Sequence, residues 1–183
     1  MFAIVTGNSR GIGLAISESL RREGFVVPII DRKDYDLMHS GIERLFRDYP
    51  ECGVLVNNVG GMGRSKQEDW SDCMKKNYGI AFELTYFYLP KMIKKRFGRV
   101  ITISSICSLD YSGLPWFNAA KSAQNVLNNS LARRYEGVTF NTICPDKVNV
   151  KPGENYKLNP DDISDVALSL IKSKIDGATI KVC

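Results

Sequence analysis

The sequence contains a single histidine, His39, and only five cysteines, which are widely spaced and form no CxxC pair. One histidine cannot build a histidine-rich metal site, and it is the only candidate base for Ser-His-Asp chemistry. We therefore expect no bound metal. An odd number of scattered cysteines is typical of reduced thiols, so we expect a cytoplasmic protein and not a disulfide-stabilised one.

The chain also lacks long hydrophobic runs and long blocks of one charge. It contains no stretch of about 18 apolar residues and no basic segment ahead of an apolar one at its start, so we expect neither a membrane span nor a signal peptide. The formal net charge is +5, and the longest basic cluster is Lys94–Arg96. This diffuse charge indicates neither a nucleic-acid partner nor a membrane partner.

Short apolar segments alternate with amphipathic segments along the 183 residues. The pattern predicts strands at Phe2–Thr6, Phe25–Ile30, Val54–Asn57, Arg99–Ser104, Val138–Cys144 and Ala178–Val182. It predicts helices at Ile12–Arg22, Ser40–Asp48, Gln67–Asn77, Gly79–Arg96, Trp116–Tyr135 and Pro160–Lys172. Such alternation indicates a parallel sheet covered by helices on both faces. At about 150 residues per domain, we expect one α/β domain over residues 1–183.

A glycine-rich turn, Thr6-Gly7-Asn8-Ser9-Arg10-Gly11-Ile12-Gly13, joins the first strand to the first helix. Gly7 allows the tight turn, Gly11 lets the backbone approach a pyrophosphate, and Gly13 lets the helix pack closely on the strand. The helix N-terminus offers free N–H groups to the phosphates. The turn therefore predicts a dinucleotide site.

Asp31 follows the second predicted strand. A carboxylate there can accept hydrogen bonds from the adenosine ribose hydroxyls and repels a 2′-phosphate, which favours NAD. Arg10 and Arg32 leave NADP open, because a guanidinium at either position can bind that phosphate.

These motifs resemble the short-chain dehydrogenase/reductase family over nearly the whole chain. They occur in the family's order: the glycine-rich turn, Asn57–Gly60 for the family's NNAG, Asn77, Ser104-Ser105, Lys121 and Pro145. The resemblance implies a three-layer, doubly wound sheet of the Rossmann type. It also implies hydride transfer between a nicotinamide and a secondary alcohol or ketone, and a homodimer or homotetramer joined through the helices near residues 79–96 and 116–135.

The resemblance implies roles for single residues as well. Asn77 resembles the Asn that orders a water relay, Ser105 the Ser that holds the substrate oxygen, and Lys121 the Lys that binds the nicotinamide ribose. The family pattern places further cofactor-site residues at Asn8, Ser9, Arg10, Ile12, Asp36, Leu37, Asn58, Val59, Gly60, Pro145 and Val148.

Phe117 departs from the family, whose Tyr-x-x-x-Lys motif has its catalytic tyrosine at this position, one helical turn before Lys121. Phenylalanine cannot transfer a proton, and a positioned general acid contributes about 10²–10⁴-fold. We therefore expect cofactor binding with weakened chemistry. Three explanations stay open: a natural non-catalytic nicotinamide-binding protein or sensor, an engineered Tyr→Phe replacement, or another donor such as Tyr111.

Two shortened regions also depart from the family. The stretch between Asp31 and Val54 has space for little more than one short helix, so we expect a vestigial third strand around Tyr35–Leu37 without its preceding helix. Pro28 then marks a near-edge strand. The loop after Pro145 is only Asn149–Asn159, which predicts an open site for a large carbonyl substrate, linked to a carrier or nucleotide, or a site completed by a partner.

Overall fold

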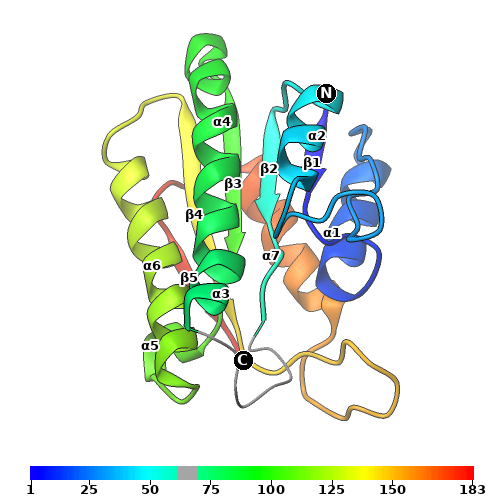
Figure 1. Cartoon of the computed structure of the whole chain (residues 1–183), viewed down its shortest axis with the longest axis vertical. Helices are drawn as coiled ribbons and strands as arrows, with labels where there is room; N and C mark the ends of the chain where they lie inside the picture. Colours follow the sequence, from blue (N-terminus) through cyan, green and yellow to red (C-terminus); the bar gives the residue numbers. More distant parts are fainter. Residues whose placement is uncertain (62–69) are drawn as a thin grey trace.

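The computed structural model describes residues 1–61 and 70–183, and its strands form one parallel sheet in chain order (Figure 1). The strands are β1 (Ala3–Val5), β2 (Val54–Asn57), β3 (Gly98–Ile103), β4 (Val138–Pro145) and β5 (Thr179–Val182). The helices are α1 (Gly11–Arg22), α2 (Gly41–Asp48), α3 (Trp70–Met74), α4 (Ile80–Lys95), α5 (Cys107–Asp110), α6 (Pro115–Ala132) and α7 (Pro160–Lys172), with a π-helical turn η1 (Lys75–Gly79) before α4. Of the helices in the described ranges, none is long and apolar enough to cross a membrane.

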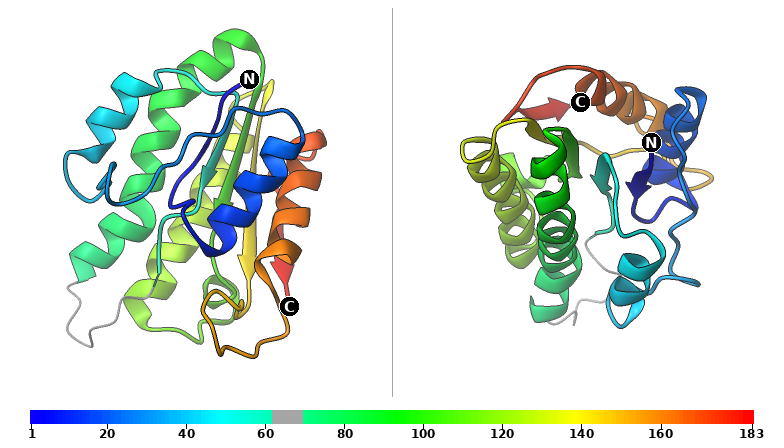
Figure 2. Two further views of the ribbon diagram at one scale, coloured as in Figure 1. Left: turned by 90° about the vertical axis from the view of Figure 1, so that its right-hand side faces the viewer. Right: turned by 90° about the horizontal axis from the view of Figure 1, so that it is seen from above.

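Helices bury both faces of the sheet, which confirms the predicted α/β architecture (Figure 2). The register aligns Ile4, Leu55, Val100 and Phe140 in one fully buried row. This row belongs to the core under α2, α4 and α6. Because successive strand residues point to opposite faces, their neighbours Val5, Val56 and Ile101 pack with α1 and α7 instead. The continuous apolar runs of the strands follow from this double burial.

The predicted strand Phe25–Ile30 is wrong as a strand, although the segment does lie beside β1. Only one isolated bridge forms, between Phe2 and Val26. Pro28 has no N–H to donate to a ladder. The Asn8 side chain binds the backbone groups that a strand would pair with its neighbour. Its Nδ2 donates to the Pro28 carbonyl at 2.7 Å, and its Oδ1 accepts from the Ile30 N–H at 2.7 Å.

The vestigial third strand expected around Tyr35–Leu37 is also wrong, because residues 32–40 form turns and connecting coil. The carboxylates of Asp31 and Asp36 accept hydrogen bonds from the backbone N–H groups of Lys33 and Met38, at 2.9 and 3.1 Å. Such local side-chain bonds compete with strand pairing. No helix occurs between α1 and α2, a stretch that the structure describes throughout, as expected.

The two helices predicted at Gln67–Asn77 and Gly79–Arg96 form one run from Trp70 to Lys95, and Gln67 lies outside the described residues. The π-helical turn η1 joins α3 to α4 where a break was expected. Pro90 lies inside α4, which continues to Lys95; the kink expected at Pro90 stays a prediction. The short helix α5 was not predicted, because Cys107–Asp110 is too short to show a helical period.

Candidate active site

A cleft of about 760 Å³ lies at the carboxyl ends of the strands. The segment before Ile30 lies on one side of β1 and β2 lies on the other, which is the kind of switch point where doubly wound sheets bind ligands. The predicted residues that line the cleft are Gly7, Ser9, Arg10, Gly11, Ile12, Asp31, Arg32, Asp36, Leu37, Asn58, Val59, Gly60, Ser105, Phe117, Lys121, Pro145 and Val148. Asn8, Gly13 and Asn77 are buried behind this lining.

The glycine-rich turn forms a close-packed cradle at one end of the cleft. Gly7 has a φ of 66°, the left-handed region that glycine tolerates best. A Cβ on Gly13 would lie 2.5 Å from the Gly7 carbonyl oxygen, so only glycine fits there. The Asn58 side chain donates to the Thr6 carbonyl at 2.8 Å and holds the turn against β2.

The N-terminus of α1 lies at this cradle, because the helix begins at Gly11. It has no side-chain cap and no acidic residue in its first turn. The N–H groups and the positive end of the helix dipole therefore suit an anion such as a pyrophosphate.

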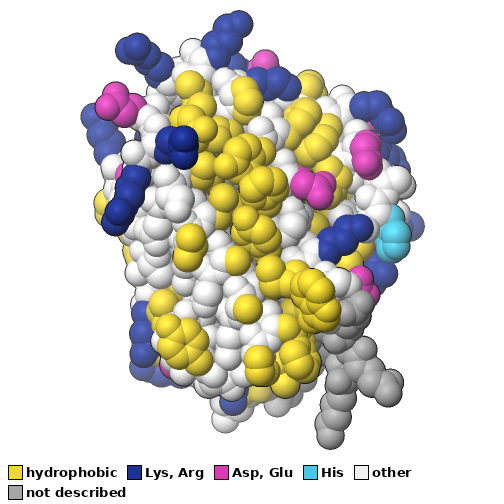
Figure 3. Space-filling view, turned by 60° about the vertical axis from the view of Figure 1, so that its left-hand side comes forward, with side chains coloured by type: hydrophobic (Ala, Val, Ile, Leu, Met, Phe, Trp, Pro, Cys, Tyr) yellow, Lys and Arg dark blue, Asp and Glu magenta, His cyan; other side chains and the backbone are white. Residues whose placement is uncertain are grey.

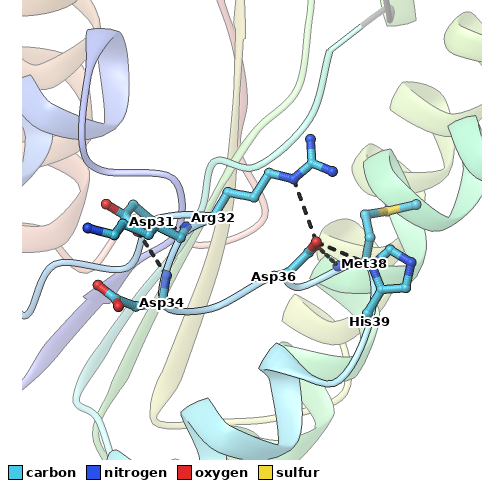
Figure 4. A network of polar contacts seen from close by, with 7 residues as sticks. Asp31, Arg32, Asp34, Asp36, Met38 and His39 are labelled. Carbon is cyan, nitrogen blue, oxygen red and sulfur yellow. Dashed lines mark hydrogen bonds and ion pairs between the residues drawn. The ribbon is translucent and has the colours of Figure 1, made fainter.

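Acidic and basic side chains follow each other along the turns beside Ile30 (Figure 4). One oxygen of Asp31 accepts from the N–H groups of Lys33 and Asp34, which leaves its second oxygen for a ligand. Arg32 pairs with Asp36 at 3.6 Å. Burial alone would raise the pKa of the Asp36 carboxyl, but the Met38 N–H, His39 and Arg32 together lower it.

Asn77 holds the loop after β2. Its Oδ1 accepts from the Gly61 N–H at 2.8 Å, and its Nδ2 donates to the carbonyls of Gly61 and Cys73. A Cβ on Gly60 would lie 2.7 Å from Asn77 Oδ1 and 3.0 Å from Lys121 Nζ. The loop therefore approaches Lys121 closely only because residue 60 is glycine.

Lys121 is 4% exposed and lies on α6 at the other end of the cleft. Its Nζ donates to the Ile103 carbonyl at 2.8 Å and to the Gln124 side chain at 3.1 Å. Burial lowers the pKa of this ammonium to about 8, although the thiols of Cys144 and Cys73 act weakly in the opposite direction.

Phe117 lies one turn before Lys121 on α6, and its ring centre is 5.9 Å from Nζ. Ser105 also lines this end of the cleft, and its Oγ accepts from the Cys107 N–H at 3.2 Å. Its hydroxyl proton is thus available to a ligand. Ser104 instead donates to the Lys121 carbonyl and fixes α6 on β3.

The segment after β4 closes the cleft on the side of the glycine-rich turn. Val148 bridges to Leu158, which ties the ends of the short loop together. A Cβ on Gly11 would lie 3.2 Å from Val150, so this loop touches the cradle. Tyr111, the alternative proton donor, is 71% exposed and is not part of the cleft lining.

Several cleft residues were missed from the sequence: Tyr35, Met38, Gly61, Asp72, Lys76, Asp146 and Val150. Buried Gln124, which holds Lys121 from outside the lining, was missed as well. A polar residue one turn after Lys121 on a buried helix face could have indicated Gln124. Asp72 and Lys76 reach the cleft from α3 and η1. The remaining residues reach it through loop and turn conformations that no sequence period describes.

Comparisons with known proteins identify the family of the chain and agree with its fold. Residues 30–159 match the family model described as "short chain dehydrogenase". The 3-oxoacyl-[acyl-carrier-protein] reductases FabG of Haemophilus influenzae and Escherichia coli are each 31% identical over 174 residues, covering 78% of this chain and 72% and 71% of those proteins. A crystal structure of a short chain dehydrogenase/reductase family oxidoreductase from Burkholderia thailandensis superposes with a TM-score of 0.82 at 21% identity, covering 99% of this chain and 90% of that chain.

Proposed function

The chain belongs to the short-chain dehydrogenase family of NAD(P)-dependent oxidoreductases, and from that premise we propose that it binds NADH in the cleft beside a secondary alcohol or ketone. The observation that carries the proposal is the position of Lys121, Ser105 and Phe117 at one end of a cleft whose other end is the glycine-rich turn. The proposal includes a weakened proton transfer, because Phe117 stands beside Lys121 where an acid is needed.

The cleft fits a nicotinamide dinucleotide. The uncapped N-terminus of α1 offers N–H groups to a pyrophosphate, and Gly13 and Gly60 allow the close packing of the glycine-rich turn and of the loop after β2 that line the cleft. When bound, the nicotinamide gives or takes the hydride. The Lys121 ammonium would hold the nicotinamide ribose, and the Ser105 hydroxyl would donate a hydrogen bond to the substrate oxygen and polarise the carbonyl.

The non-catalytic alternative has a specific observation in its favour. Within the described lining of the cleft, the only phenol is Tyr35. Tyr35 belongs to the turns near Asp31, and its hydroxyl donates to Asp48 at 2.8 Å. Burial and that bond raise its pKa further. With Tyr111 outside the cleft, no described phenol is placed to replace the missing acid, so a cofactor-binding sensor is the second candidate.

The substrate we propose is a carbonyl compound linked to a carrier. The FabG relatives are 3-oxoacyl-[acyl-carrier-protein] reductases. In this chain the segment between β4 and α7 is residues 146–159. We expect a loop of this length to leave space for a substrate that extends out of the protein. A 3-oxoacyl thioester is therefore the first compound to assay.

We expect NADH to bind more tightly than NADPH, because the free oxygen of Asp31 can accept from ribose hydroxyls and repels a 2′-phosphate. Asp31→Asn should shift the ratio of the two dissociation constants toward NADPH by about tenfold, as expected when one charge repulsion is removed. The measurement is a nucleotide fluorescence titration. Asp34→Asn is the matched control, since exposed Asp34 is not in the cleft lining. A preference of the unchanged chain for NADPH would show that Arg10 and Arg32 outweigh Asp31.

We propose self-association through α4 and α6, where apolar side chains gather on the surface (Figure 3). The ring centres of Phe82 and Tyr86 lie 4.5 Å apart along α4, and the two residues are 37% and 44% exposed. Val126 on α6 is 64% exposed. Sedimentation velocity should show a dimer or tetramer that Val126→Lys dissociates. Ile29→Lys, which changes an equally exposed apolar residue beside β1, should leave the assembly intact. A monomer at every concentration of the unchanged chain would rule the proposal out.

A further inference from the structure

A buried chain of polar groups connects α6 to the π-helical turn before α4. Lys121 Nζ donates to Gln124 Oε1 at 3.1 Å, and Gln124 Nε2 donates to the backbone carbonyl of Asn77. Gln124 is 1% exposed and Asn77 is fully buried. Buried polar side chains are costly unless their partners are matched, so this arrangement needs a physical reason.

The π-helical turn supplies the acceptor. In η1 the Ile80 N–H donates to the Lys75 carbonyl, a bond that spans five residues and not four. Such a turn shifts the hydrogen-bond register of a helix and is frequent at functional sites. The Asn77 carbonyl lies within this turn and accepts a hydrogen bond from the side chain of Gln124 on α6.

A primary amide suits this position better than other side chains. One of its partners, the Lys121 ammonium, only donates, and the other, the Asn77 carbonyl, only accepts. An uncharged amide can accept from the first and donate to the second, whereas a carboxylate only accepts and a thioether does neither well. The two partners also fix which end of the amide carries the oxygen.

The amide also determines where the ammonium can point. An ammonium has three protons, and Lys121 gives two of them to Gln124 and to the Ile103 carbonyl. The third remains for the cleft, which Lys121 lines. Among the described residues, the titratable groups that act on this ammonium are the thiols of Cys73 and Cys144, on α3 and β4.

We propose that Gln124 is a positioning residue, whose amide links the Lys121 ammonium to the Asn77 carbonyl and thereby aims the ammonium at the cleft. The expected effect of Gln124 on cofactor binding rests on the proposed function, in which Lys121 holds the nicotinamide ribose. The expected effect of Gln124 on the pKa of the Lys121 ammonium does not depend on any cofactor.

The test compares two replacements of similar length, Gln124→Met and Gln124→Glu. Gln124→Met removes the acceptor and should lower the pKa of Lys121 further, whereas Gln124→Glu places a carboxylate against the ammonium and should raise it. The pKa is read from competitive acetylation of amines with acetic anhydride across pH, with the Lys121 peptide quantified by mass spectrometry. Opposite shifts support a positioning role. A Lys121 titration that is the same in both variants as in the unchanged chain would overturn it.

The control is Leu131→Ala, which opens a cavity elsewhere on the same helix, because Leu131 is buried in the core away from Lys121. It should lower stability and leave the labelling of Lys121 unchanged. If Gln124→Glu does not fold, Gln124→Met alone decides the question by the direction of its shift.

NADH titration of the same proteins separates this inference from the proposed function. Gln124→Met should weaken NADH binding by about three- to tenfold, the effect expected when one hydrogen bond that orients a charged group is lost. Opposite pKa shifts without NADH binding to the unchanged chain would uphold the positioning role and refute the proposed function. NADH binding to the unchanged chain, with the same pKa of Lys121 in both Gln124 variants, would support the proposed function and refute the positioning role.

Discussion

Phe117→Tyr is expected to raise the turnover of 3-oxoacyl thioesters with NADH by at least about 100-fold. The new hydroxyl would lie on the same face of α6 as Lys121, whose Nζ is 5.9 Å from the centre of the present ring. A buried ammonium lowers the pKa of a neighbouring phenol by favouring its anion, so the phenol would become an effective general acid. The measurement is the steady-state loss of NADH absorbance.

The control for this gain is Phe117→Leu, which removes the ring without adding a hydroxyl and should give no increase. A double variant, Phe117→Tyr with Lys121→Met, should lose most of the gain, since the phenol would then lack the neighbouring charge. If Phe117→Tyr stays inactive on a broad panel of carbonyl compounds while it binds NADH, the enzymatic proposal fails and the sensor is favoured.

Replacing Lys121 with Met is expected to change how stability depends on pH. Burial lowers the pKa of Lys121 from 10.5 to about 8, so between these two values the unfolded chain binds a proton that the folded chain does not. The free energy of unfolding must therefore rise with pH in this window, by up to about 3 kcal/mol from this group. Below pH 8 the folded chain bears the full cost of the buried charge.

Urea unfolding of the unchanged chain and of Lys121→Met across this pH range measures that contribution as the difference of two curves. The comparison is needed because Tyr35, Tyr88 and Cys52, whose pKa values burial raises, make stability fall with pH in both proteins. Parallel curves would show that Lys121 is not desolvated in the folded chain. The absolute stability of Lys121→Met is less informative, because the Ile103 carbonyl loses its partner there.

Sequence patterns predict those parts of the fold and cleft that depend on local chemistry. Val54–Asn57 is a strand and Pro160–Lys172 a helix over the predicted ranges, because apolar runs and an N-terminal proline act over a few residues. The left-handed φ of Gly7 and the close contact at Gly13 likewise follow from the motif itself.

The parts that sequence patterns miss depend on contacts between distant segments. The segment before Ile30 fails to become a strand because the side chain of Asn8 replaces the ladder next to Pro28. The π-helical turn around Asn77 is paired with a glutamine from α6. Helical spacing could have indicated Gln124 itself, but no sequence pattern shows which distant residue either side chain contacts.

The most direct test is to measure NADH affinity for the unchanged chain and for Phe117→Tyr side by side by fluorescence titration. Phe117 is 6% exposed. The glycine-rich turn, the N-terminus of α1 and Lys121, which would hold the cofactor, are the same in both proteins. We predict saturable binding with dissociation constants that agree within about threefold, together with the difference in turnover given above. Absence of NADH binding by both proteins would contradict the account, because the cleft would then not be a nicotinamide site.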